Sequence, residues 1–79
     1  MRVIRVRVAA HGRVKKYLED RLEGTIELKE GAYIKNLFHA LSKPRDEIWL
    51  ANVNGLVVHE EYRLRDGDEI IIFEPVGGG

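Results

Sequence analysis

Four apolar residues in the middle of the chain recur at the spacing of one helical face, and this stripe limits the fold more than any other feature. They are Ile34, Leu37, Phe38 and Leu41, at positions i, i+3, i+4 and i+7. We expect a helix over residues 33–41, ended before Pro44, because proline disfavours helix in the residue that precedes it. The first position, Tyr33, is not one of the usual N-terminal capping residues. A helix with one apolar face needs a second apolar layer, which the rest of the chain must supply.

The segments before this stripe alternate apolar and polar residues, as half-buried strands do. We expect strands over residues 3–9 and 24–28, paired antiparallel, with a short helix or helical turn within residues 13–22 between them. Arginines occupy the outward positions of the first strand and are interpreted as a solvated face. The inward positions are Ile4, Val6, Val8, Ile26 and Leu28.

The segments after the stripe contain a strong hairpin signal. Asn54-Gly55 lies between two apolar runs within residues 48–58, and both residues tolerate the left-handed backbone of a tight turn. An acidic turn at residues 64–68 then leads to the last strand, Glu69–Phe73, which is apolar at nearly every position. Such a run is typical of a central strand. Asp66, Asp68 and Glu69 are interpreted as turn residues, with Asp68 or Glu69 available to basic groups of a partner.

These elements predict an α+β fold of the β-grasp type, in which a mixed four- to five-stranded sheet packs against one main helix. The first and last strands should lie adjacent and parallel at the sheet centre. With 79 residues the chain is expected to form one domain over residues 1–76 and a flexible glycine tail over residues 77–79. The predicted core also includes the helical stripe together with Val53, Ile70 and Ile72.

Charge and composition exclude several classes of function. Thirteen basic and thirteen acidic residues balance, which argues against a nucleic-acid-binding protein. The chain has no cysteine and its three histidines are widely spaced, so we expect no disulfide and no metal site. Its apolar runs are too short to cross a bilayer, and the expected compartment is the cytoplasm.

The last fourteen residues, DGDEIIIFEPVGGG, combine an acidic-glycine turn, an apolar strand, Pro75-Val76 and terminal glycines. In this the chain resembles the ubiquitin-like sulfur carriers of the MoaD/ThiS type, and most of all the small subunit of molybdopterin synthase. The hairpin, the turn at residues 29–31 and the valine-rich first strand also match that family. Glu74 departs from the pattern, because a second proline is frequent there.

The resemblance implies that the carboxylate of Gly79 is the reactive group. In the family, an ATP-using adenylyltransferase that resembles the ubiquitin-activating enzyme activates such a carboxylate, which then becomes a sulfur-donating thiocarboxylate. Gly78 and Gly79 lack a Cβ, so an extended end of this kind can enter a narrow channel. Any sulfur that the chain carries must be attached to the C-terminus, because the chain has no thiol. The chain would be a protein co-substrate without a bound cofactor, and the ATP would be used by the partner.

A docking surface is expected beside the tail. If Ile70 and Ile72 face the helix, strand alternation places the residues between and after them on the opposite face, where an exposed apolar patch marks a binding surface. Pro75 would stiffen the exit of the chain toward its partner. The residues predicted to bind partners are Leu50, Ile71, Phe73, Pro75, Val76 and Gly77.

The final sulfur acceptor stays open at this point. The molybdopterin resemblance implies a heterotetramer with two copies of a larger synthase subunit, but a molybdenum or tungsten pterin, thiamine and a tRNA base are all compatible acceptors. Two alternatives are a ubiquitin-like modifier conjugated to lysine through Gly79, and a plain β-grasp interaction module. In the second alternative the glycines are a frayed end without chemistry.

Overall fold

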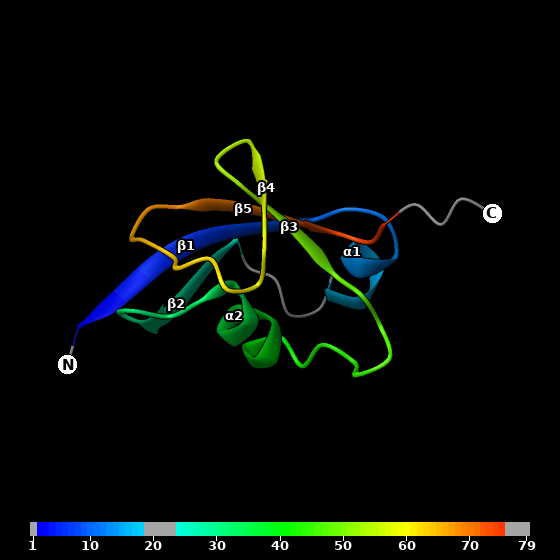
Figure 1. Cartoon of the computed structure of the whole chain (residues 1–79), viewed down its shortest axis with the longest axis horizontal. Coiled ribbons are helices and arrows are strands. Elements are labelled where there is room, and N and C mark those ends of the chain that lie inside the picture. Colours follow the sequence, from blue (N-terminus) through cyan, green and yellow to red (C-terminus); the bar gives the residue numbers. More distant parts are fainter. Residues whose placement is uncertain (1, 19–23, 76–79) are drawn as a thin grey trace.

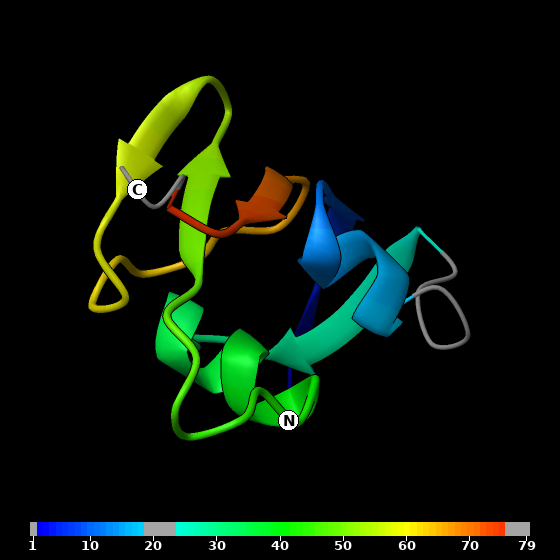
Figure 2. The same ribbon diagram turned by 90° about the vertical axis from the view of Figure 1, so that its right-hand side faces the viewer.

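The structure, a computed structural model, describes residues 2–18 and 24–75. These residues form a five-stranded mixed sheet with its main helix on one face (Figures 1 and 2). The elements, in chain order, are β1 (Val3–Ala10), α1 (Arg13–Leu18), β2 (Thr25–Lys29), α2 (Ile34–Ala40), β3 (Leu50–Val53), β4 (Leu56–Val58) and β5 (Glu69–Phe73). No helix in the described part of the chain is long and apolar enough to cross a membrane.

The strand order is β2-β1-β5-β3-β4, so β1 and β5 lie at the centre of the sheet. They are parallel, with Val8 opposite Ile70 and Ala10 opposite Ile72, whereas the other three strand pairs are antiparallel. A parallel pair needs a long crossover connection, which the segment from α1 to β4 provides. This arrangement is the predicted β-grasp fold.

The core lies between α2 and one face of the sheet. The burial of β1 alternates strictly, and its even positions face α2 as predicted. Ile26 and Leu28 were expected in the core but are only partly buried, because β2 is an edge strand at the margin of the layer. The other predicted core residues are all buried: Ile4, Val6, Val8, Ile34, Leu37, Phe38, Leu41, Val53, Ile70 and Ile72.

Two large core residues were not predicted from the sequence. Trp49 is buried before β3 begins and packs edge-on against Phe38, with ring centroids 5.5 Å apart. Its indole N–H donates a hydrogen bond of 3.0 Å to Glu47 Oε1, which satisfies the polar atom of the ring. Leu64 is also buried, in the segment between β4 and β5. The core therefore takes part of its volume from connecting segments.

The hairpin between β3 and β4 turns where it was predicted. Asn54 and Gly55 have φ values of 52° and 95°, which are the left-handed conformations that a two-residue turn between antiparallel strands requires. In the next turn Asp68 is only 6% exposed, so of the two residues expected to be available to a partner it is Glu69 that is exposed. Its carboxylate accepts hydrogen bonds from the Arg65 N–H at 2.8 Å and from Asn54 Nδ2 at 2.9 Å.

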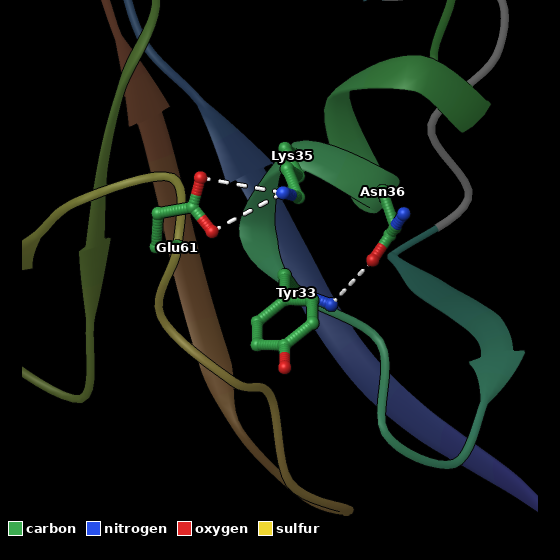
Figure 3. A network of polar contacts seen from close by, with 4 residues as sticks. All are labelled: Tyr33, Lys35, Asn36 and Glu61. Atoms are coloured by element: carbon green, nitrogen blue, oxygen red, sulfur yellow. Dashed lines mark hydrogen bonds and ion pairs between the residues drawn. The ribbon is translucent and has the colours of Figure 1, made fainter.

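The N-terminus of α2 is capped by groups other than the side chain of Tyr33. The Tyr33 N–H donates a hydrogen bond of 2.7 Å to Asn36 Oδ1, one turn into the helix (Figure 3). The N–H groups of the next two residues donate to the carbonyls of Tyr62 and Glu60, both at 2.9 Å. The absence of a capping side chain at Tyr33 is thus compensated by Asn36 and by a distant segment of the chain.

Candidate functional site: the exit of the last strand

The last strand leads directly to the exit of the chain from the sheet. Strand β5 ends at Phe73, and the described chain continues through Glu74 to Pro75, at the same end of the molecule as α1 (Figure 1). Pro75 is exposed, and its role in binding a partner stays a prediction. The predicted reactive residues Gly78 and Gly79, and the predicted partner-binding residues Val76 and Gly77, lie outside the described residues.

The three predicted docking residues within the sheet come together on the face opposite α2, called the open face below. Leu50 and Phe73 lie directly opposite each other on β3 and β5. Ile71, two residues before Phe73, lies on the same face and is also partly exposed. These three side chains form what we call the apolar patch. The patch adjoins the exit of the chain, and its role in binding stays a prediction.

One exposed apolar residue near the exit was missed in the sequence. Ile48 is 66% exposed and, together with Pro75, lines a shallow cleft of about 230 Å³. The signal was present, because the alternation that turns Ala51 and Trp49 inward turns Leu50 and Ile48 outward. Ile48 thus adds apolar surface on a second side of the exit.

Four charged residues line the cleft at the exit: Arg13, Asp46, Glu47 and Glu74. Glu74, the residue that departs from the family pattern, lies 4.0 Å from a guanidinium nitrogen of Arg13. The Arg13 side chain is largely exposed, so solvent screens this pair and its contribution to stability is small. The described residues at the exit thus combine the apolar surface of Ile48 and Pro75 with charged side chains.

The remaining charges of the open face belong to β1, β2 and β5. The outward arginines of β1 are exposed, as predicted, and Arg5 Nε lies 2.9 Å from Glu27 Oε2 on β2. Within residues 2–18 and 24–75, no group of three or more His, Asp or Glu residues is placed to hold a metal ion.

Comparisons with known proteins agree with this architecture. The family model described as the ThiS family matches residues 12–79. A Pyrococcus furiosus protein, described as a candidate molybdopterin converting factor, subunit 1, is similar in structure with a TM-score of 0.77 and 26% identity. The similarity covers 92% of this chain and 99% of that protein. A comparison with curated protein sequences gives no match.

Two archaeal modifier proteins also share the fold. The small archaeal modifier protein 1 from Methanosarcina acetivorans is similar with a TM-score of 0.69 and 20% identity over the whole of both chains. SAMP1 from Haloferax volcanii is similar with a TM-score of 0.64 and 16% identity, over 95% of this chain and 99% of that one. At these identities the likeness extends to the fold alone.

Proposed function

Because the chain belongs to the ThiS family, we propose that it is a sulfur carrier whose Gly79 carboxylate is converted to a thiocarboxylate. The observation that carries this proposal is the family match itself, which covers residues 12–79 and so includes α2, the strands after β1 and the glycine end. The chain is then a protein co-substrate, and its partners are catalysts.

The proposed chemistry takes place on the partner proteins. The carboxylate of Gly79 attacks the α-phosphate of ATP held by an adenylyltransferase, which gives an acyl adenylate and releases pyrophosphate. A sulfide equivalent supplied by a donor then displaces AMP and leaves a thiocarboxylate. The sulfur then bonds to the acceptor, and water hydrolyses the acyl carbon–sulfur bond, which leaves the sulfur on the acceptor and restores the carboxylate. Gly78 helps by presenting no side chain, because two residues without a Cβ can pass a narrow channel in extended form.

The apolar patch is proposed to dock both partners in turn. All three residues of the patch are partly exposed. Phe73 is the last residue of β5 and Leu50 lies opposite it, so a partner that covers the patch also receives the tail. Pro75, Val76 and Gly77 would then form the neck that enters the partner. Pro75 fixes one backbone dihedral angle of this neck and reduces the entropy lost on binding.

The proposed acceptor is the precursor of molybdopterin, with the chain as the small subunit of a heterotetrameric synthase that contains two copies of a larger subunit. The structural similarity to the Pyrococcus furiosus protein supports this choice over thiamine or a tRNA base. A second candidate is a ubiquitin-like modifier conjugated to lysine, which the fold shared with the archaeal modifier proteins favours. Both roles begin with adenylation of Gly79 and differ in the nucleophile that follows.

Intact-mass measurement tests the proposal and separates these roles. The chain is incubated with a cognate activating enzyme, ATP and a sulfide donor. A sulfur carrier gains the mass difference between sulfur and oxygen, whereas a modifier gives branched conjugates to lysine. The variant lacking Gly78 and Gly79 should gain no sulfur, because removal of the last residues shifts the carboxylate by up to ~3.5 Å per residue. Its stability should not change.

The matched control is Gly77→Ser, which keeps the length of the tail and should still accept sulfur. If the shortened chain still formed a thiocarboxylate and delivered it, Gly79 would not be the reactive residue and the proposal would be wrong.

A further inference from the structure

A depression in the open face lies beyond the apolar patch, on the side away from the exit of the chain. Its volume is about 600 Å³, and Ile71 belongs both to its lining and to the apolar patch. Its other side-chain lining comes from β1, β3 and β5 and from the hairpin turn, namely Arg7, Ala9, Asn52, Asn54 and Glu69. The depression and the patch are therefore parts of one continuous surface.

Two of the residues that line the depression are small, Ala9 and Gly24. Ala9 is exposed and lies opposite Ile71, so an alanine occupies a position where its neighbour carries a large side chain. The pairing of β2 with β1 ends at Thr25 opposite Arg7, and beyond it the Val8 N–H donates a 2.8 Å hydrogen bond to the Gly24 carbonyl. Gly24 also lines the depression and has no side chain to fill it.

The wall formed by the hairpin is held in place by hydrogen bonds. Asn54 Oδ1 accepts a bond of 2.9 Å from the Glu69 N–H, while Asn54 Nδ2 donates to the buried carboxylate of Asp68. The Gly55 N–H donates to Asn52 Oδ1, also at 2.9 Å. A depression with fixed walls is preformed, as binding pockets usually are, and loses little entropy when it is filled.

The rim combines a cation, an anion and an apolar floor. Arg7 and Glu69 are neighbours in the register of β1 and β5, and both line the depression. Unlike Arg5, which pairs with Glu27, neither makes an ion pair with any residue in the described ranges. A guanidinium group stacks on the face of an aromatic ring, and a carboxylate accepts a hydrogen bond from an O–H or N–H at the edge of that ring.

These features together select one class of occupant. We propose that the depression receives a single tyrosine or tryptophan side chain of the activating enzyme, which docks on the open face; this inference rests on the proposed function. The ring would lie on Ala9 and Ile71, with Arg7 over its face and Glu69 at its polar edge. Tyr, Trp and Arg are the residues most enriched among those that dominate binding energy at protein interfaces.

The first test uses small probes and needs no partner protein. N-acetyl-tryptophanamide and N-acetyl-leucinamide are titrated separately into the chain while the backbone amides are followed by NMR. Saturable shifts of the amides of Ala9, Ile71 and Glu69 are expected with the tryptophan probe and not with the leucine probe. Equal shifts with both probes, or none at millimolar concentrations, would overturn the proposal.

Variants locate the binding in the depression. Ala9→Phe fills the depression and should abolish the probe shifts, and its fold should survive because Phe is favoured on an exposed strand position. Ala40→Phe places the same ring on the exposed end of α2 and should bind the probe as the unmodified chain does. Arg7→Gln should lower the affinity for the tryptophan probe severalfold, whereas Arg2→Gln, with the same change in net charge, should leave the affinity unchanged. If Ala9→Phe and Ala40→Phe, or Arg7→Gln and Arg2→Gln, changed probe binding equally, the depression would not be the binding site.

The second test measures the partner. With the activating enzyme, Ala9→Phe should raise the KM for the carrier at least about tenfold with little change in kcat, and Ala40→Phe should change neither. If Ala9→Phe leaves the KM unchanged and the chain still gains sulfur, docking of the activating enzyme in the depression is refuted and the proposed function is not affected. Conversely, a wild-type chain that binds the tryptophan probe but never gains sulfur refutes the proposed function alone.

Discussion

Removal of the buried carboxylate of Asp68 should destabilise the fold far more than its place in an acidic turn suggests. The residue is only 6% exposed, and its carboxylate links the turn before β5 to the hairpin between β3 and β4. It accepts hydrogen bonds from the Arg65 N–H and from Asn54 Nδ2, and Asn54 in turn holds the start of β5. The substitution Asp68→Ala removes the acceptor for both donors.

The magnitude follows from these contacts. A hydrogen bond to a charged group contributes about 1.5–3 kcal/mol, and the Asn54 amide can regain part of its bond from water because Asn54 is exposed. We therefore expect Asp68→Ala to lower the free energy of unfolding by about 2–4 kcal/mol. A domain of this size has a total of roughly 4–12 kcal/mol, and 1 kcal/mol shifts its Tm by about 4–8 °C. Asp68→Asn should cost about half as much, since the amide keeps one acceptor oxygen.

Urea denaturation followed by circular dichroism measures this loss. The matched control is Asp46→Ala, which removes an exposed carboxylate that makes no hydrogen bond or ion pair with the described residues. The control should change the free energy of unfolding by no more than about 0.5 kcal/mol. If Asp68→Ala also stayed within that limit, water would replace the carboxylate at little cost, and the argument from burial would be refuted.

Three further predictions concern the core, the apolar patch and the hairpin. Phe38→Ala should cost about 3–5 kcal/mol, because it opens a cavity and removes the edge contact with Trp49; a loss below about 1 kcal/mol in urea denaturation would contradict this. Phe73→Glu should weaken binding of the activating enzyme by about 2 kcal/mol or more without changing the Tm, and either unfolding or unaltered binding would speak against a docking role. Gly55→Val should cost at least about 1–2 kcal/mol, because a branched side chain is strained at a φ of 95°, so an unchanged urea midpoint would be inconsistent with the turn.

The periodic patterns of the sequence were sufficient to predict the architecture. Alternation in β1, the helical stripe from Ile34 to Leu41 and the Asn54-Gly55 turn each report on neighbouring residues, so local rules identify them without knowledge of the fold. The parallel pairing of β1 and β5 also followed, since a β-grasp fold leaves few arrangements for these elements. The resemblance in the last fourteen residues pointed to the family that the comparisons then identified.

Other features depend on contacts between residues that are far apart in the sequence. Local pattern placed Asp68 in an exposed turn, but its burial depends on Asn54, fourteen residues away. The capping of α2 uses the carbonyls of Glu60 and Tyr62, which no rule about the helix itself could identify.

The depression in the open face has the same origin as these features. Its lining combines Arg7, where the pairing of β2 with β1 ends, Gly24, which lies beside Val8, and Ala9, which lies opposite Ile71 of β5. Each of these residues is unremarkable in its own segment. The sequence by itself determined which segments become strands and helix, because that choice depends on periodicity over a few residues. The tertiary structure alone decided which polar groups are buried and where the surface is hollow, because both depend on the strand register that brings distant segments together.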